Sequence, residues 1–207
     1  MYHPNLKAHY RFESTQLNLG IDASGNGHHG TVYGATQGIG QFGGGADFDG
    51  VNDRIDLPDS VRPIRDFTIS MYLYQRSFGT AKAALALSKR GILFLYGNGT
   101  TTVRFYVYNG AFKYVDIPTS IIPLNNWYHI AQTYDGVNIK VYINGVFIDS
   151  TPCSGDIVYA LTDYNTIGSY SQEPRYFDGS LDEVKIFNKA YDNLIDVNLL
   201  RIGQNPR

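Results

Sequence analysis

The sequence contains little of several residue types on which common functions depend. Cys153 is the only cysteine among 207 residues, so no disulfide can form within the chain. Charged residues make up 17% of the chain, and its net charge of -2 gives no electrostatic reason to expect nucleic acid as a partner. No apolar run approaches the roughly 20 residues of a membrane span, so membrane insertion is not expected. The first residues, MYHPNLKAHYRF, also lack the basic and then apolar pattern of a signal peptide.

Glutamate is scarce as well, whereas tyrosine, phenylalanine and glycine are abundant. The only glutamates are Glu13, Glu173 and Glu183, and all other acids are aspartates. Aspartate is typical of turns and calcium loops, and glutamate is typical of helices. The 17 tyrosines, 11 phenylalanines and 22 glycines favour strands and turns. This composition therefore predicts a β-rich protein.

Apolar and polar residues alternate with period two in three segments. These are LKAHYRF at 6–12, FTISMYLY at 67–74 and TVRFYVY at 102–108. Asn-Gly pairs at 109–110 and 144–145 predict two-residue hairpin turns between neighbouring strands. Strands that follow one another through turns predict antiparallel sheets, and two stacked sheets make a β-sandwich.

The pattern changes to helical spacing only near the end of the chain. In NKAYDNLIDVNLLR, at 188–201, Asp192 is placed to cap a short C-terminal helix. No internal repeat or linker interrupts the sequence. We therefore expect one domain over residues 6–201, with loose tails at 1–5 and 202–207.

The segment DASGNGHHGTVYG, at 22–34, is rich in glycine and carries two adjacent histidines. It lacks the spacing and the lysine of a phosphate-binding loop. His28 and His29 would point to opposite faces of an extended backbone, which argues against a shared zinc ion. Two readings stay open: a calcium loop, and a turn that Asp22 and Ser24 close through side-chain hydrogen bonds.

Four segments together resemble one family. They are DASGNGHHGT at 22–31, ADFDGVNDRIDLPDS at 46–60, NWYHIAQTYDG with KVYINGVF within 126–147, and FDGSLDEVKIFNKAY at 177–191. In this order they are similar to the laminin-G-like domains of the concanavalin A-like lectin/glucanase superfamily. The resemblance covers roughly residues 6–200 and implies an all-β, single-domain jelly-roll sandwich of two antiparallel sheets, one concave and one convex.

The resemblance also implies a structural calcium ion and a surface that binds glycans or proteins. Asp22, Asn26 and the carbonyl groups around His28 would supply oxygen ligands, and Asp182 would join them from the last strand. Two departures from the family pattern bear on this. Met71-Tyr72 follows FTIS where relatives often have Ala-Trp, which puts an inherited sugar site in doubt, and Tyr191-Asp192 replaces Leu-Ser.

A second acidic cluster lies at Asp47, Asp49, Asp53 and Asp56. It could bind another calcium ion, but a solvated turn around Gly50 is the favoured reading.

Catalysis is not expected from this sequence. A glucanase needs two carboxyl groups about 5 Å apart for retention, or roughly 6.5–9.5 Å apart for inversion. No glutamate has such a partner in sequence. Asp182 and Glu183 are neighbours, so on a regular strand they would point to opposite faces.

Ligand binding must then depend on aromatic side chains of the polar strand faces. The predicted binding residues are Tyr72 and Tyr74 on one strand, and Arg104, Tyr106 and Tyr108 on another. The alternative is that these rings form a second packing layer. Trp127 and His129 are predicted to belong to the core.

These observations predict a non-catalytic, calcium-stabilised recognition module that binds glycan or protein. An alternative is a structural decoration, cement or fibre-associated protein of a virus particle, with other virion proteins as partners. It arises because the family acts outside cells while this chain begins with Met1 and shows no leader. The expected location is extracellular or the virion surface. A glucanase-type glycoside hydrolase is the least favoured reading.

Overall fold

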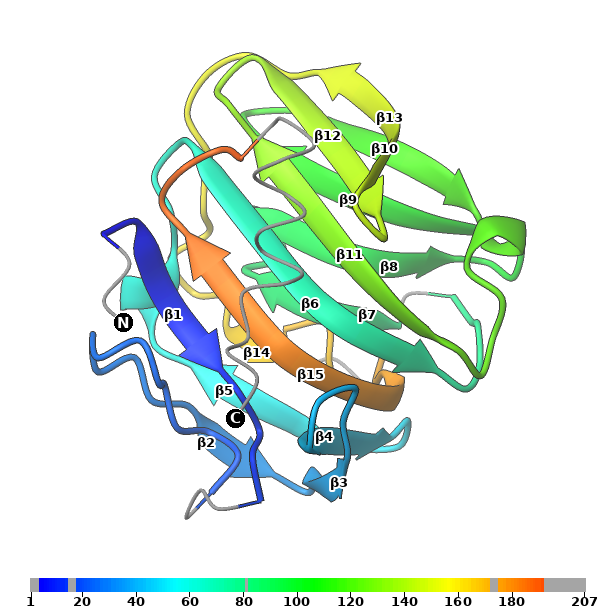
Figure 1. The fold of residues 1–207 in the computed structure, drawn as a ribbon. Coiled ribbons are helices and arrows are strands. Elements are labelled where there is room, and N and C mark those ends of the chain that lie inside the picture. Colours follow the sequence, from blue (N-terminus) through cyan, green and yellow to red (C-terminus); the bar gives the residue numbers. More distant parts are fainter. Residues whose placement is uncertain (1–3, 15–17, 81, 172–174, 192–207) are drawn as a thin grey trace.

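The computed structural model describes residues 4–14, 18–80, 82–171 and 175–191, which form two antiparallel sheets. Sheet A has eight strands in the order β13-β12-β11-β6-β15-β4-β3, and β1 pairs with β15 beside this path. Their bounds are β1 (Leu6–Tyr10), β3 (Thr36–Ile39), β4 (Gly44–Asp49), β6 (Phe67–Gln75), β11 (Trp127–Tyr134), β12 (Asn138–Ile143), β13 (Val146–Pro152) and β15 (Asp178–Phe187). Figure 1 shows sheet A in front.

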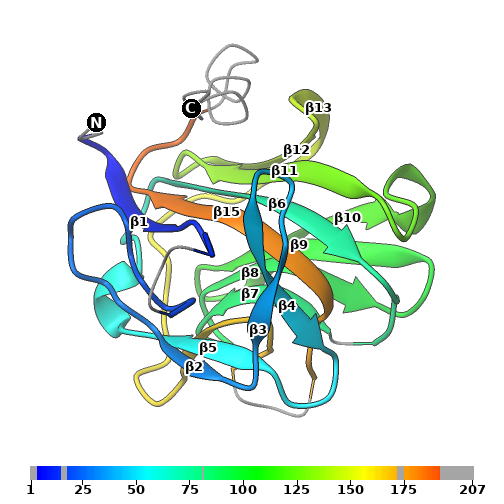
Figure 2. The same cartoon turned by 60° about the horizontal axis from the view of Figure 1, so that its bottom comes forward.

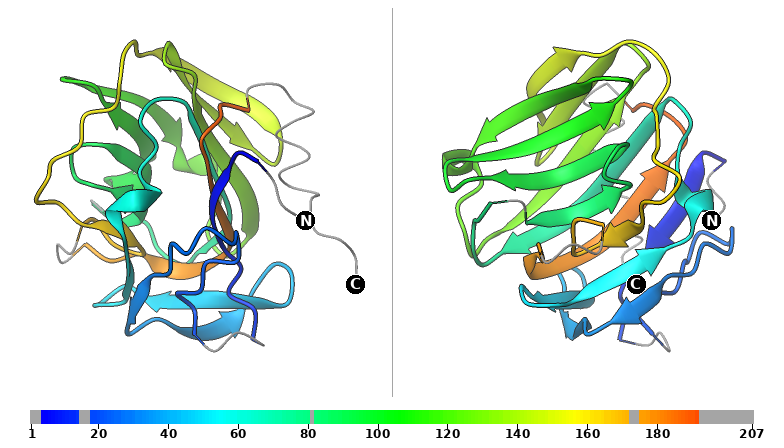
Figure 3. Two further views of the ribbon diagram at one scale, coloured as in Figure 1. Left: turned by 90° about the vertical axis from the view of Figure 1, so that its left-hand side faces the viewer. Right: turned by 180° about the vertical axis from the view of Figure 1, so that it is seen from behind.

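Sheet B has seven strands in the order β10-β9-β8-β7-β14-β5-β2. Their bounds are β2 (Thr31–Tyr33), β5 (Arg54–Leu57), β7 (Ala83–Leu87), β8 (Ile92–Asn98), β9 (Thr102–Tyr108), β10 (Phe112–Pro118) and β14 (Asn165–Ile167). Two short 3-10 helices, η1 (Asp59–Val61) and η2 (Thr119–Ile121), lie in the connections. The two sheets face each other when viewed from the side (Figure 3). The predicted all-β jelly-roll sandwich is therefore confirmed.

The period-two pattern decides which side chains enter the core. On β6, Phe67, Ile69 and Met71 belong to the main core cluster, and the alternating residue Tyr72 lies on the other side of the sheet. We call this other side, which faces away from sheet B, the outer face of sheet A. The large rings of the core interlock, as Phe94 and Phe105 do in an edge-to-face pair at 5.3 Å.

The predicted hairpin turns are present, with one difference. Asn144 and Gly145 have φ angles of 51° and 82°, as a two-residue turn of type I′ requires, and they connect β12 directly to β13. Between β9 and β10, however, Tyr108 pairs with Phe112, so three residues rather than two form the connection. The prediction of a two-residue turn at Asn109-Gly110 is wrong by one residue.

The two ends of the described chain meet in sheet A. β1 pairs with β15 so that Leu6 lies opposite Phe187, and the amide of Asn188 donates to the carbonyl of Asn5 at 2.9 Å. The predicted C-terminal helix after Tyr191 lies outside the described residues, as do most of the predicted tails.

A bulge in β15 overturns one expectation. Asp182 lies opposite Tyr72 and Lys185 lies opposite Ser70, so β15 has one more residue than β6 over this stretch. Glu183 takes a left-handed φ of 53°. Leu181 and Val184 both point into the core. Asp182 and Glu183 therefore share the outer face of sheet A, and the prediction that they point to opposite faces is wrong.

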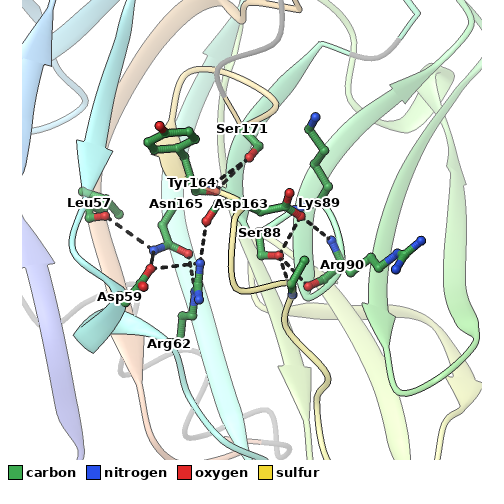
Figure 4. A network of polar contacts seen from close by, with 11 residues as sticks. Leu57, Asp59, Arg62, Ser88, Lys89, Arg90, Asp163, Tyr164, Asn165 and Ser171 are labelled. Atoms are coloured by element: carbon green, nitrogen blue, oxygen red, sulfur yellow. Dashed lines mark hydrogen bonds and ion pairs between the residues drawn. The ribbon is translucent and has the colours of Figure 1, made fainter.

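A polar network joins the connections around sheet B (Figure 4). Arg62 donates to Oδ1 of Asn165 at 2.7 Å and to the carbonyl of Asp163 at 2.7 Å, and it forms an ion pair with Asp59 at 2.9 Å. Oδ2 of Asp163 accepts hydrogen bonds from the Ser88 hydroxyl at 3.0 Å and from two backbone amides of the β7–β8 turn. These groups satisfy one another, so the network fixes η1 and the β7–β8 turn against β14.

Candidate ligand-binding site

A shallow cavity of about 270 Å³ lies on the outer face of sheet A. Its lining residues come from four places in the chain: the β3–β4 hairpin, β6, the start of β11 and the β12–β13 turn. They are Gln41, Phe42, Tyr72, Trp127 and Asn144. Figure 2 shows how the β3–β4 hairpin rises over β15.

Three of the five lining residues are aromatic. The ring of Phe42 meets Tyr72 edge-to-face at 5.0 Å between centroids. The Trp127 ring lies 5.6 Å from that of Tyr74, its cross-strand neighbour. Tyr72 is only 7% exposed, whereas Phe42 is 39% exposed. Tyr72 thus supports the site from below, and Phe42 is open to a ligand.

Asn144 is held at the rim by the backbone of β11. The side-chain Oδ1 of Asn144 accepts a hydrogen bond from the backbone amide of His129 at 3.0 Å. The backbone amide of Asn144 donates to the carbonyl of His129 at 2.7 Å. Asn144 adopts its left-handed conformation because the tight turn demands it, and asparagine tolerates this conformation better than most residues. The side-chain amide therefore has a fixed position beside the rings.

Asp182 positions the opposite wall. Its Oδ2 accepts a hydrogen bond from the backbone amide of Phe42 at 2.9 Å. The hairpin itself closes through a bond from the Gly40 amide to the Gly43 carbonyl at 3.0 Å. A Cβ atom on Gly40 would overlap the Gly44 carbonyl and approach Asp182, so only glycine lets the hairpin lie this close to β15.

The acids beneath the hairpin are closed to solvent. Asp182 is 0% exposed and Glu183 is 1% exposed. Burial raises the pKa of Asp182 to about 7, and the charges of Glu183 and Glu13 add to this effect. For Glu183, burial also opposes ionisation, but a 2.6 Å contact with His9 and an ion pair with Lys185 hold its pKa below the ordinary value. Neither carboxyl group can reach a ligand in the cavity.

The predicted calcium residues Asp22, Asn26 and His28 lie in one loop against β1. Oδ1 of Asp22 accepts from the amides of His9 and Ser24, each at 2.9 Å. Its Oδ2 accepts from the Ser24 hydroxyl at 2.8 Å and from the His28 amide at 2.9 Å. Burial alone would raise the pKa of Asp22, but these four hydrogen bonds hold it below the ordinary value.

The other proposed ligands of this loop are occupied as well. The Asn26 side chain donates to the carbonyls of Leu6 and Lys7 at 2.8 and 3.0 Å. The His28 carbonyl accepts from the hydroxyl of Tyr10 at 2.6 Å. The loop therefore clamps β1 through its own hydrogen bonds.

These contacts do not fit a calcium ion. All four hydrogen-bonding positions of the Asp22 carboxylate are filled, and Asp182 contacts the 40–43 hairpin instead. Within the described ranges, no group of three or more histidine, cysteine, aspartate or glutamate side chains could hold a metal ion. The turn closed by Asp22 and Ser24 accounts for the observed geometry, and calcium at this loop stays a prediction.

The second acidic cluster has the features of a turn. Oδ1 of Asp49 accepts from the amide of Val51 at 2.8 Å, and Oδ2 of Asp53 accepts from the amide of Asp49 at 2.9 Å. Asp47 forms an ion pair with Arg76 at 2.6 Å.

The five predicted ligand-binding residues do not form one site. Tyr72 and Tyr74 lie on β6 in sheet A, at or beside the cavity. Arg104, Tyr106 and Tyr108 lie on β9 in sheet B, on the other side of the sandwich.

The sheet B residues contact one another and their own strands. Tyr106 is 5% exposed, donates to the Lys89 carbonyl at 2.7 Å and packs in a small apolar cluster. Arg104 binds both oxygens of Asp116, each at 2.7 Å, and lies over the Tyr114 ring at 3.7 Å. Tyr106 therefore belongs to a second packing layer, which was the alternative to a role in ligand binding.

The sequence did not predict several of the residues that line the cavity. Trp127 was expected in the core, but it is only half-buried and lines the cavity. His129 is buried on the outer face, where its ring contacts Tyr72 at 5.0 Å. Gln41, Phe42 and Asn144 carry no local signal except that glycines beside them mark hairpin tips.

Comparison with known structures shows the same fold in other solved domains. Domain 4 of AbnA, a GH43 extracellular arabinanase from Geobacillus stearothermophilus solved in complex with arabinotriose, is 24% identical with a TM-score of 0.77. The match covers 95% of this chain and 98% of that one.

Two toxin domains are similar over part of their length. The binding domain of Paraclostridial Mosquitocidal Protein 1 has 20% identity and a TM-score of 0.76, and that of botulinum neurotoxin serotype D has 13% and 0.70. Each match covers 97% of this chain. This chain spans about half the length of those two, 53% of the first and 52% of the second.

None of the curated proteins matches the chain in sequence. Among the described residues, no helix is long and apolar enough to cross a membrane. A laminin G family model, described as the concanavalin A-like lectin/glucanases superfamily, matches residues 49–193. The chain therefore belongs to the concanavalin A-like lectin/glucanases superfamily.

Proposed function

We propose that this protein is a non-catalytic recognition module that binds a glycan in the cavity on the outer face of sheet A. The observation that carries the proposal is the lining itself, in which Phe42 and Trp127 offer apolar rings beside the amides of Gln41 and Asn144. Aromatic rings stack on the apolar faces of sugars, and amides both donate to and accept from hydroxyl groups. A concave site that combines aromatic side chains with a few placed polar groups is typical of ligand binding.

The similar structures support a binding role. The AbnA domain was solved with arabinotriose, and the two toxin domains are binding domains. The absence of catalysis is part of the proposal, because Asp182 and Glu183 are closed off from the cavity. Release of reducing sugar from any bound glycan would contradict it.

A glycan array followed by titration calorimetry tests the binding. We expect a neutral oligosaccharide to bind, and Trp127→Ala to weaken its binding at least tenfold. Phe112→Ala is the matched control, since Phe112 is a 51% exposed ring on sheet B. An array without hits, obtained with folded protein, would contradict the proposal and leave a protein ligand as the next candidate.

A role on a virus particle, and a location outside cells or on the virion surface, stay predictions. They have a separate test, because a virion protein must be present on purified particles at fixed stoichiometry. Absence from such particles would refute the virion role without affecting the glycan site.

A further inference from the structure

The chemistry of the cavity lining restricts the kind of sugar that fits. None of its five residues, all of them described, carries a charge. An acidic sugar brings a carboxylate or sulfate group, and the lining offers this group no cation, so it forms no ion pair in the cavity.

The size of the cavity limits the length of the bound segment. The volume of about 270 Å³ lies below the roughly 300–1,000 Å³ of pockets that hold a drug-sized ligand. This is room for one sugar ring and part of a second. The walls on its two sides belong to the 40–43 hairpin and the 144–145 turn, with Tyr72 between them.

We propose that the cavity binds a single uncharged sugar unit, at the end or on a side branch of a glycan, and discriminates against acidic sugars. This inference rests on the proposed function and names its ligand class. Phe42 and Trp127 contact the ring faces, and Gln41 and Asn144 bind the hydroxyl groups.

The test compares galactose with galacturonic acid at pH 7, because the two rings differ only in the carboxylate. Trp127 is the only tryptophan of the chain, so its fluorescence reports on this cavity. We expect galactose to change the emission of Trp127 at concentrations at least tenfold below those needed for galacturonic acid. Glucose and glucuronic acid form a parallel pair and should show the same difference. Arabinobiose and arabinotriose should differ less than threefold in affinity.

A second test uses a variant with a positive charge in the cavity, which should weaken the preference for neutral over acidic sugars. Gln41→Lys places a cation in the cavity at an exposed position and should shift the ratio of acid to neutral affinity by tenfold or more towards the acid. Thr100→Lys, an exposed residue of the β8–β9 turn, is the matched control and should leave the ratio unchanged.

The outcomes separate the inference from the function on which it rests. Binding of galacturonic acid as tight as that of galactose, or a tenfold gain with each added arabinose unit, would overturn the inference and leave the glycan site intact. No response of Trp127 to any sugar, together with an empty glycan array, would overturn both.

Discussion

The amide of Phe42 donates a 2.9 Å hydrogen bond to Asp182, a fully buried carboxyl group 140 residues further along the chain. This single bond ties the tip of the β3–β4 hairpin to the bulge in β15. It links the position of an exposed cavity wall to the protonation state of a buried acid.

Asp182→Asn should stabilise the protein above neutral pH. The native pKa of Asp182, about 7, lies above the ordinary value of 3.8, so the folded protein holds a proton that the unfolded chain releases. The free energy of unfolding therefore falls as the pH rises from about 4 to about 7, and the loss persists above pH 7. Three pKa units correspond to about 4 kcal/mol as an upper limit. Asparagine keeps an acceptor for the Phe42 amide without the charge.

Urea unfolding at pH 5 and pH 8 measures this difference. Asp156→Asn, whose side chain is 69% exposed, serves as control and should leave the pH dependence unchanged. An Asp182→Asn protein with the same pH dependence as wild type would show that the pKa of Asp182 is not raised in the folded protein.

Asp22→Ala should destabilise the protein by about 2–4 kcal/mol, because three backbone amides and one hydroxyl lose their acceptor in a buried loop. The pKa of Asp22 is depressed, so its contribution is present above the ordinary value of 3.8 and is lost as the pH falls through the lower native value. Thermal unfolding at pH 7 gives the magnitude.

Removal of calcium with a chelator should leave the melting temperature of the wild type unchanged, since the Asp22 oxygens are filled by protein donors. An ion bound only to the native state would instead raise the melting temperature with its concentration. A fall of several degrees on chelation, absent in Asp22→Ala, would establish the calcium site that the sequence predicts.

Gly40→Ala should weaken sugar binding at least tenfold. The added Cβ overlaps the Gly44 carbonyl and pushes the hairpin, with Phe42, away from the cavity. Gly99→Ala is the control, because its Cβ meets nothing within 4 Å and its positive φ of 82° gives ordinary backbone strain. Calorimetric titration measures the affinity, and equal affinity in both variants would mean that the hairpin does not form the wall of the site.

Arg62→Met should cost about 2–4 kcal/mol, since the Asn165 Oδ1 and the Asp163 carbonyl lose charged donors within the network of Figure 4. Arg65→Met removes an arginine whose side chain is 52% exposed and whose ion-pair contacts are 3.7 Å long, and it should change stability by less than about 1 kcal/mol. Similar losses in both variants, seen by urea unfolding, would contradict a special role of the network.

Local patterns were sufficient to predict much of the fold. The alternation in β6 assigns Phe67 and Ile69 to the core, and the Asn144-Gly145 pair specifies a tight turn. Both features depend on residues that are adjacent in the sequence. The bulge at Glu183 is different, because its left-handed φ of 53° falls on a residue without the usual preference for it.

The candidate site could be predicted only in part, because strand order cannot be read from a sequence. Tyr72 and Tyr74 were identified as exposed-face aromatics, but the partners of Tyr72 are Phe42 and His129, which lie on distant segments. The same limit explains why Arg104 was grouped with Tyr72 although they lie on different sheets.

The residues that line the cavity differ in how much the fold depends on them, and this difference affects how the ligand specificity can change. Tyr72 belongs to a central strand and is held by the sheet, whereas Phe42 and Asn144 stand on the tips of two hairpins. Neither tip segment, 40–43 or 144–145, contributes a residue to the main core cluster. Substitutions of Gln41 and Phe42, which are exposed, therefore alter recognition at small expense in folding. Exchange of the 40–43 and 144–145 segments between relatives offers a direct route to new ligand preferences on an unchanged framework.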